Sequence, residues 1–501
     1  MRRLVPCVAL GLAMPACTII YDPGDLPRPD GALVDAPPPD APYDADPAQL
    51  EVTAIEPDSV LEGTGGDGGR PATFVIDGDS ITRDVVVTAA FTDGAMETLA
   101  IEDVVVADDG RRAAVAVRIP VDDQLPVGAS RTLRFTLAQA GVTGDADVTV
   151  AGLDELTLTA DAGRAVTSLA AMYSRITVTG AVHFTGAVPA MLRATGDITL
   201  GATLDVDAVG ATPGPHGCAG GGDNTHGGCG AGGGQQGKDN SLLTLMSGDG
   251  GGGGSFGSAG TDGVGEDGAP GTPTGNDMLV PIVTAGTDAG NRGNGGGGGG
   301  AGSLGGAGLQ GGSGGGVILI ASGADLVVTA GEVSADGGDG ASANSKGGGG
   351  GGSGGAILVR AAGTITASGP WLHAEGGSGG TAGNHGGDGG LGRIRVDVPG
   401  TPGSTSTSPV AVRGPAWAAD APVLVGAPDV TVRLHGEPGR TFVVMVGDDA
   451  VADQSINASG FRDYALTLAA GHNEVCAITD ATQLARDEAR SCIDIVYLHA
   501  P

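Results

Sequence analysis

Two stretches of this sequence repeat one another, and the repeat constrains the fold more than any other feature. Residues 315–340 read GGVILIASGADLVVTAGEVSADGGDG, and residues 354–380 read GGAILVRAAGTITASGPWLHAEGGSGG, so the second copy begins 39 residues after the first. Each copy contains short apolar strands joined by Gly, Ala and Asp. A strand of this kind cannot bury its apolar face alone, but it can do so by stacking on the strand of the next copy. The repeat therefore favours a stack of similar units over a single compact core.

Weaker copies extend the stack in both directions. They are SRITVTGAVHFTG at residues 174–186, MLRATGDITLGATLDVDAVG at 191–210 and GRIRVDV at 392–398. We therefore expect a mainly β protein with a right-handed parallel β-helix over residues 153–400. This pattern resembles the β-helical, glycine-rich exported proteins of gliding and predatory Gram-negative bacteria.

Glycine-rich insertions separate the copies. Glycine contributes 98 of the 501 residues, chiefly in the tracts at 214–316 and 337–355. These tracts could be disordered, because glycine loses more conformational entropy on ordering than any other residue. They could instead pack as extended helices with three residues per turn, because glycine lets backbones approach to hydrogen-bonding distance. Such helices occur in glycine-rich adhesins and receptor domains. The GGGGGG runs at 295–300 and 347–352 are where ordered packing should occur.

The N-terminus has the pattern of a secretory signal peptide. Arg2 and Arg3 precede an apolar run over residues 4–14. A run of this length is too short to span a bilayer as a helix. We therefore expect export from the cytoplasm, with residues 1–16 as the signal peptide.

The end of the signal peptide resembles the lipobox of bacterial lipoproteins. The sequence MPAC at 14–17 places a cysteine directly after an apolar residue and a small residue. The resemblance implies that Cys17 carries the lipid, including palmitate. Thr18, rather than Asp, after this cysteine fits export to the outer membrane. The alternative is ordinary cleavage after Ala16, which leaves Cys17 unmodified.

A charged tether follows the lipobox. The tether takes in residues 17–48; of these, residues 22–48 alternate Pro and Asp and contain few apolar groups, so they cannot bury enough surface to fold. At about 3.1 Å per residue, residues 22–48 could hold the rest of the chain up to roughly 80 Å from the membrane. Asp/Pro linkers after a lipobox resemble those of surface lipoproteins from the same bacteria. No later segment approaches 18 consecutive apolar residues, so the lipid would be the membrane anchor.

Two further regions flank the repeat, and both predict β-sandwiches. In residues 49–152, roughly alternating β-branched segments are separated by Gly, Asp and Pro, which favours a sandwich. AIEPDSVLEG at 54–63 and LPVGASRTLRFTL at 125–137 resemble parts of an IPT/TIG-type immunoglobulin-like domain. Residues 409–501 show the same alternation, and we expect a second immunoglobulin-like sandwich there. DATQLARDEARS at 480–491 could form a helical turn or a loop.

The cysteines fit an oxidising compartment. After removal of Cys7 with the signal peptide and lipidation of Cys17, four cysteines remain in two local pairs. We expect disulfides between Cys218 and Cys229 and between Cys476 and Cys492. Each would pin a short loop or staple a small sandwich.

Zinc is the alternative for the first pair. His216, Cys218, His226 and Cys229 offer four ligands of suitable chemistry. Their spacing matches no familiar zinc finger, and a thiolate site competes poorly with oxidation outside the cytoplasm. We therefore favour the disulfide and expect no metal or cofactor.

No motif in the sequence has catalytic spacing. A glycan-cleaving enzyme needs paired carboxylates, often beside aromatic residues that stack on sugar rings. The acidic residues of the repeats lie mostly in glycine-rich turns; they are Asp325, Asp336, Asp339, Glu375 and Asp388. Arg360, Arg393 and Arg395 alternate along their strands, which predicts solvated faces. Trp371 is expected to pack at the edge of a coil. We therefore expect no enzymatic activity.

The sequence thus predicts a lipid-anchored structural or adhesive protein of the cell outer membrane, facing the surface or the periplasm. Its partners would be the membrane and an extracellular glycan or another cell-surface protein. Nucleic acid is excluded, because a net charge of −33 repels phosphate. One alternative is a β-helix enzyme or binding protein acting on extracellular polysaccharide, which needs carboxylates that converge on one exposed face. Another is a calcium-stabilised matrix protein, suggested by the acidity.

Overall fold

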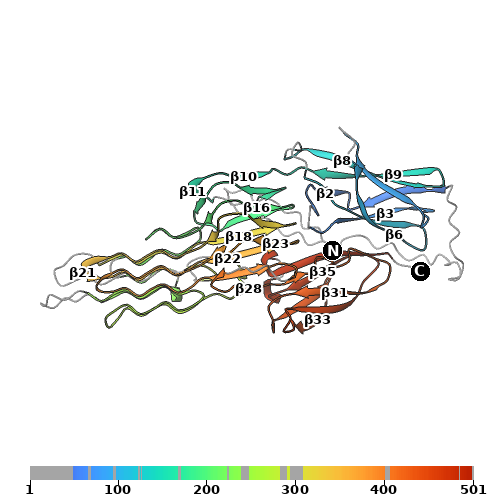
Figure 1. The fold of residues 1–501 in the computed structure, drawn as a ribbon. Coiled ribbons are helices and arrows are strands. Elements are labelled where there is room, and N and C mark those ends of the chain that lie inside the picture. Colours follow the sequence, from blue (N-terminus) through green and yellow to red (C-terminus); the bar gives the residue numbers. More distant parts are fainter. Residues whose placement is uncertain are drawn as a thin grey trace, which may run out of the picture. The chain divides into compact units, whose positions relative to one another are not determined.

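The computed structural model describes residues 49–498, with gaps at 66–68, 94–97, 122–124, 126, 167–170, 223–224, 229, 239–247, 283–289, 294–307, 401–406 and 484–485. The described residues belong to one compact unit. They are almost entirely β, with several parallel sheets and no α-helix (Figure 1). The expectation of a mainly β fold is confirmed. The predicted signal peptide, Cys17 and the tether lie outside the described residues.

Strands β10 to β28, apart from β21 and β25, form three long parallel sheets, and we call this part the coiled region. The first sheet contains β10 (Leu156–Leu158), β13 (Ile176–Val178), β16 (Ile198–Leu200), β19 (Leu326–Val328) and β23 (Ile365–Ala367). The second contains β11 (Asp161–Ala165), β14 (Val182–Thr185), β17 (Leu204–Asp205), β20 (Val333–Ser334), β24 (Leu372–His373) and β27 (Thr407–Ser408). The third contains β12 (Met172–Tyr173), β15 (Ala190–Ala194), β18 (Val317–Ser322), β22 (Ala356–Ala361), β26 (Arg393–Asp397) and β28 (Val412–Arg413).

The chain visits the three sheets in turn, so each circuit stacks on the one before it. Val317 pairs with Ala356, and Leu326 pairs with Ile365, which is the 39-residue register of the sequence repeat. The weaker copies join the same stack, since Met191 pairs with Leu319. β21 (Ala343–Gly347) and β25 (Ala382–Asn384) form a separate parallel pair. Parallel pairing continues to β28, beyond Pro409, where the sequence placed the start of the C-terminal domain.

Apolar side chains fill the inside of the coiled region. Ile198, Leu326 and Ile365 occupy paired positions on consecutive coils and are almost completely buried. They belong to one cluster that runs through all three sheets. Trp371, which was expected at the edge of a coil, belongs to this cluster at 1% exposure and so packs inside the coils. Stacking thus buries apolar faces that no single short strand could bury alone.

Residues 51–151 form a pair of packed sheets, the N-terminal sheet pair. One sheet contains β1 (Glu51–Glu56), β3 (Ala72–Asp79), β7 (Arg112–Val117) and β6 (Ile101–Val106). The other contains β2 (Ser59–Leu61), β9 (Val142–Ala151), β8 (Ser130–Gln139), β4 (Val86–Phe91) and β5 (Thr98–Leu99). The rings of Phe74 and Phe135 meet between the sheets, with centroids 5.0 Å apart.

Residues 416–497 form a second pair, the C-terminal sheet pair. One sheet contains β29 (Ala416–Trp417), β31 (Asp429–His435) and β34 (Phe461–Thr467). The other contains β30 (Leu424–Val425), β36 (Arg490–Tyr497), β35 (Gly471–Ile478), β32 (Thr441–Val446) and β33 (Asp449–Ser455). Two 3-10 turns, η4 (Ala481–Gln483) and η5 (Asp487–Ala489), connect β35 to β36, as the sequence of that segment predicted.

Candidate functional site

The predicted disulfide between Cys476 and Cys492 is confirmed. The two residues face each other on neighbouring strands β35 and β36, and their sulfurs are bonded. Cys218 is also in a disulfide. Its predicted partner Cys229 lies outside the described residues, so that pairing stays a prediction.

The alternative zinc site loses a ligand in this arrangement. The sulfur of Cys218 is in a disulfide and is therefore not a thiolate. The ring of His216 is buried, its Nδ1 lies 3.2 Å from the Ala187 carbonyl oxygen, and burial lowers its pKa. His226 is exposed. Within the described ranges, the one cluster with metal-ligand geometry is Glu474 with Cys476 and Cys492, whose sulfurs are already bonded to each other.

The glycine tracts are ordered where the structure describes them. Residues 347–355 are all buried, and we call them the central glycine segment. The backbone N–H of Gly251 donates to Gly348 at 2.9 Å, and three residues further along Gly254 donates to Gly351 at 2.8 Å. The same three-residue step recurs where Gly312 donates to Gly350 and Gly315 donates to Ser353. This periodicity is that of an extended helix with three residues per turn.

Several segments surround the central glycine segment and bond to it, and we call the assembly the glycine layer. They are residues 248–257, 310–316, 335–341, 374–380 and 384–392. Three of them close a cycle, because Gly251 donates to Gly348, Gly351 donates to Gly387, and Gly387 donates to Gly251. Ordered packing is thus confirmed for the run at 347–352, whereas the run at 295–300 lies outside the described residues.

At its glycines, the glycine layer leaves no room for a side chain. A Cβ added to Gly352 would lie 1.9 Å from the carbonyl oxygen of Ser313, and one added to Gly351 would lie 2.0 Å from that of Gly377. Backbone N–H and C=O groups therefore bond directly to other backbone groups, which satisfies them in a buried layer.

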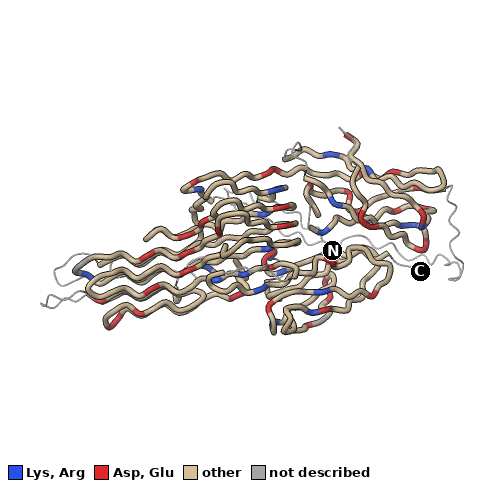
Figure 2. Tube along the Cα trace, in the orientation of Figure 1, with Lys and Arg blue, Asp and Glu red and all other residues tan. Residues whose placement is uncertain are grey.

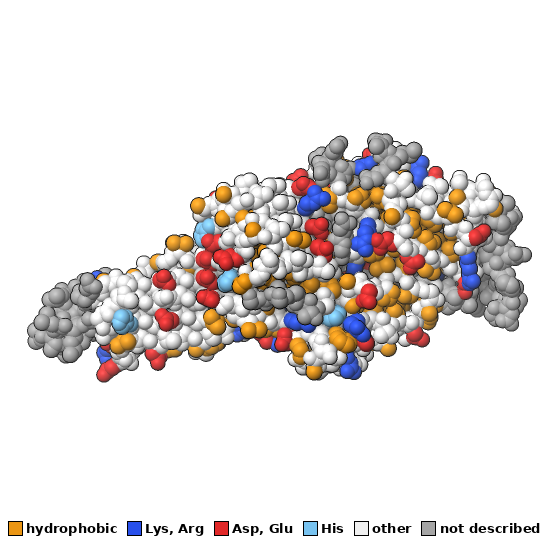
Figure 3. All heavy atoms as spheres, in the orientation of Figure 1, with side chains coloured by type: hydrophobic (Ala, Val, Ile, Leu, Met, Phe, Trp, Pro, Cys, Tyr) orange, Lys and Arg blue, Asp and Glu red, His pale blue; other side chains and the backbone are white. Residues whose placement is uncertain are grey.

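Acidic residues and histidines gather on the outer face of the second sheet. His183, Asp205, Ser334 and His373 occupy paired positions on consecutive coils. Asp207, Asp336 and Glu375 each lie two residues further along the chain, just past the ends of β17, β20 and β24. We call the five carboxylates and two histidines the acidic face; the carboxylates are Asp205, Asp207, Glu332, Asp336 and Glu375. Figure 2 shows acidic residues recurring on neighbouring coils, and Figure 3 shows them gathered beside histidines.

Hydrogen bonds tie the acidic face to the stacking of the coils. Asp207 Oδ1 accepts the backbone N–H of Asp336 at 2.5 Å, and Asp336 Oδ1 accepts that of Glu375 at 2.6 Å. His183 Nδ1 lies 2.9 Å from Asp205, and His373 Nε2 lies 3.4 Å from Glu332. Asp207 and Asp336 thus each accept a hydrogen bond from a backbone amide of the next coil.

Burial and neighbouring charge shift the titration of this face. Burial, reinforced by Asp205 and Asp336, raises the pKa of Asp207 to about 7. Burial also raises the pKa of Asp336, with further contributions from Glu375 and Glu332. A carboxylic acid with a pKa near 7 can donate or accept a proton at neutral pH, which is the property of a general acid or base. Asp207 was not among the acidic residues singled out from the sequence, although its place in the repeat matches that of Asp336.

The expected solvated position of Arg395 is wrong. Its side chain is fully buried and donates to both oxygens of Asp397, at 2.8 and 2.6 Å. Its Nη1 also donates to the carbonyl oxygens of Met278, at 2.6 Å, and Glu488, at 2.9 Å. Alternation along β26 placed this side chain on the outer face of the sheet, but the insertion and the C-terminal sheet pair cover that face.

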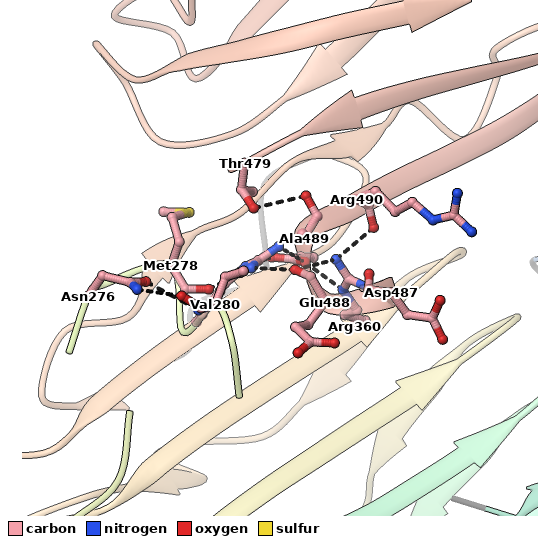
Figure 4. A network of polar contacts seen from close by, with 11 residues as sticks. Asn276, Met278, Val280, Arg360, Thr479, Asp487, Glu488, Ala489 and Arg490 are labelled. Carbon is pink, nitrogen blue, oxygen red and sulfur yellow. Dashed lines mark hydrogen bonds and ion pairs between the residues drawn. The ribbon is translucent and has the colours of Figure 1, made fainter. Parts of the chain in front are cut away.

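Arg360 extends the same network, which Figure 4 shows from close by. Its Nε donates to Asp397 at 2.7 Å, and its Nη groups donate to the carbonyl oxygens of Asp487 and Arg490 at 2.6 and 3.0 Å. Its side chain is 18% exposed, so it too lies on a largely covered face. The network joins the coiled region to the C-terminal sheet pair. Arg393 is half-buried and donates to the Thr274 carbonyl oxygen at 3.0 Å.

In the part of the chain described, no helix is long and apolar enough to cross a membrane. No protein-family model matches the sequence, and a search of the curated proteins finds no significant relative.

Proposed function

We propose that this chain is a lipid-anchored structural or adhesive protein of the cell outer membrane that works without catalysis. The glycine layer carries the proposal. Its segments bond backbone to backbone, so a long insertion becomes a firm extension of the coiled region without large side chains. The lipobox-like sequence at 14–17 and the Asp/Pro tether support attachment through Cys17. Such an extension suits the display of a binding surface to an extracellular glycan or another cell-surface protein.

The fold that we propose for this role is a right-handed parallel β-helix flanked by two immunoglobulin-like sandwiches. Three observations support it. The coiled region consists of three parallel sheets, the chain passes through these sheets in a fixed order, and the two sheets of each flanking pair pack face to face. Crossover connections between parallel strands are almost always right-handed. The resemblance of residues 54–63 to IPT/TIG-type domains points to the same architecture at the N-terminal end.

Mass spectrometry of the native membrane fraction tests the anchor. We expect a diacylated or triacylated N-terminal peptide that begins at Cys17, and we expect Cys17→Ser to move the protein into the soluble fraction. Protease treatment of whole cells then separates surface exposure from periplasmic orientation. An unmodified Cys17 in soluble protein would remove the membrane from the proposal.

A cell-binding assay tests the adhesive role. Cells that display the wild-type protein should bind to cells or extracellular matrix of the producing species more strongly than cells that display a Gly352→Ala variant, because the added Cβ disrupts the glycine layer. Gly426→Ala is the matched control, because an added Cβ there meets nothing within 4 Å. Equal binding by all three proteins would contradict adhesion through the glycine-rich extension.

The acidic face favours a second candidate, an enzyme or binding protein that acts on extracellular polysaccharide. Asp207 has a pKa of about 7 and lies near other carboxylates of the acidic face, and glycan cleavage uses a pair of carboxyl groups of which one is protonated. Incubation with neutral and acidic polysaccharides should then release reducing ends, and Asp207→Asn should abolish the release. No release from any of them, with the folded wild-type protein, would count against this candidate.

A further inference from the structure

A cavity of about 330 Å3 lies between the third sheet of the coiled region and strand β36. This volume is at the lower end of the range for small-molecule sites. Arg193, Ala321 and Arg360 line it from the coiled region. Arg490 and Asp487 line it from the C-terminal sheet pair and its preceding turn. The cavity lies apart from both the glycine layer and the acidic face.

The floor of the cavity is one row of the third sheet. Met172, Arg193, Ala321, Arg360 and Asp397 occupy paired positions on five consecutive strands. Neighbouring strands lie roughly 4.8 Å apart, so the backbones of Arg193 and Arg360 are about 10 Å apart. Only the methyl group of Ala321 stands between them in this row. The small residue therefore leaves a gap flanked by two long cationic side chains.

The arginines around this gap differ in how fully they are bonded. Arg360 is held by Asp397 and by carbonyl oxygens. Arg193 donates through Nη1 to Asp487 at 2.9 Å. Among the residues that the structure describes, none accepts a hydrogen bond from the guanidinium of Arg490. In Figure 4 its side chain extends away from the polar network.

The charge of the lining favours an anion. Three guanidinium groups and two carboxylates line the cavity, which leaves one net positive charge. This is unusual in a chain with 25 Lys and Arg against 58 Asp and Glu. Met172 and Leu319 add apolar surface to the polar rim. A ligand that matches this lining has a singly charged anionic group and a short apolar body.

We propose that this cavity binds a small organic carboxylate, with Arg490 as its principal charge partner and Arg193 as the second. Guanidinium groups bind carboxylates through paired, charge-assisted hydrogen bonds. The apolar body of the ligand would rest on Ala321, Leu319 and Met172. Asp487 limits the positive charge, so the site prefers a monoanion to a dianion.

Isothermal titration of the purified full chain with sodium octanoate tests the site. We expect one octanoate per chain, with weaker or no binding of octyl phosphate and no binding of octylammonium. Arg490→Gln should weaken octanoate binding about tenfold or more, because it removes a charge-assisted contact. Arg193→Gln should weaken it less, because that guanidinium is shared with Asp487.

Arg462→Gln is the matched control, since Arg462 is an exposed arginine of the same sheet pair. Circular dichroism and the melting temperature of each variant show whether it is folded. Equal loss of binding in Arg490→Gln and Arg462→Gln would overturn the site, and so would binding of octylammonium as tight as that of octanoate. Preferential binding of octyl phosphate would overturn the choice of a carboxylate. None of these outcomes depends on the lipid anchor or on adhesion.

Discussion

The interior of the coiled region and the central glycine segment of the glycine layer are both buried, but they are built by different means. Inside the coils, stacked side chains such as Ile198, Leu326 and Ile365 exclude water. In the glycine layer, buried backbone groups bond directly to other backbone groups. The first mode depends on the hydrophobic effect, and the second depends on close approach of the chain to itself. One chain thus uses two kinds of core with different sensitivities to mutation.

The two cores should fail in different ways. A truncated side chain in the coil interior leaves a cavity, and its cost depends on how far the neighbours relax. An added methyl group at Gly351 or Gly352 meets a backbone carbonyl oxygen at 2.0 or 1.9 Å, and no change of rotamer can relieve a clash with backbone. Truncation in the coils is therefore expected to lower stability with the fold kept, whereas a side chain added at a glycine of the layer is expected to displace the backbone.

The largest expected effect is that of Gly352→Ala. The new Cβ would lie 1.9 Å from the Ser313 carbonyl oxygen, so the central glycine segment must move and lose its bonds to Gly338 and Gly377. We expect the glycine layer to lose protection from hydrogen exchange while the coil strands keep theirs. Mass spectrometry of peptides from residues 310–316 and 374–380 measures this loss.

Gly426→Ala provides the control for that measurement, because its Cβ would stand in open space. If hydrogen exchange in the Gly352→Ala protein were as slow as in the wild-type protein, the glycine layer would accept a methyl group at this position. The distinction between the two cores would then be lost.

Arg395→Met should have the next largest effect, because Arg395 lies where the coiled region meets both the glycine-rich insertion and the C-terminal sheet pair. The substitution removes hydrogen bonds to Met278, in the insertion, and to Glu488, in the C-terminal sheet pair. It also leaves the buried carboxylate of Asp397 with Arg360 as its remaining cation. Breaking a buried ion pair costs about 3–5 kcal/mol, and we expect a loss of that order in urea unfolding.

Arg83→Met is the comparison for Arg395→Met, because Arg83 forms an exposed ion pair with Asp108. An exposed pair of this kind contributes less than about 1 kcal/mol. A loss as small for Arg395→Met would show that the network does not hold the insertion against the coils.

Leu326→Ala tests the side-chain core. Leu326 is fully buried between Ile198 and Ile365, and removal of its isobutyl group should cost about 2–5 kcal/mol. We expect the loss to appear in urea unfolding with the glycine layer still protected from hydrogen exchange in the native state. A loss of protection in the layer at low urea would mean that the two cores unfold as one unit.

Much of the coiled region follows from the sequence, because local repetition fixes register. The 39-residue spacing predicted the pairing of Val317 with Ala356, and the local pairing of cysteines predicted the bond between Cys476 and Cys492. In both cases the residues that meet in space are either equivalent positions of adjacent repeat copies or cysteines close together in the sequence. The position of Asp207 below Asp336 could have been found in the same way.

Contacts between distant segments do not follow from the sequence. All glycines look alike, so nothing in the tracts says that Gly251 bonds to Gly348 and Gly387 rather than to other glycines. The burial of Arg395 likewise depends on which segments cover the third sheet, and strand alternation records only that the side chain points outward. For the same reason the cavity beside Arg490 is a property of two regions that are remote in sequence.

The smallest expected effect concerns the outer surface of the coils, where the charge of Asp207, and not packing, changes the free energy of unfolding. Burial raises the pKa of Asp207 from the ordinary carboxyl value of 3.8 to about 7. Below pH 3.8 the group is neutral in both the folded and the unfolded chain, so its contribution to stability is fully present there. As the pH rises from 3.8 towards 7, Asp207 ionises in the unfolded chain but keeps its proton in the folded chain. This difference stabilises the unfolded chain, so the contribution of Asp207 to the free energy of unfolding is lost over this range.

Asp207→Asn removes this loss, because the amide stays neutral and its oxygen can still accept the N–H of Asp336. We expect little change in the free energy of unfolding at pH 4 and a gain on the order of 2 kcal/mol at pH 8, after solvent screening at a partly exposed site is discounted. Urea unfolding at the two pH values measures the difference, with Asp448→Asn as an exposed control. Equal effects at pH 4 and pH 8 would mean that Asp207 is charged in the folded protein throughout, and that the outer face of the coils tolerates charge as readily as open surface.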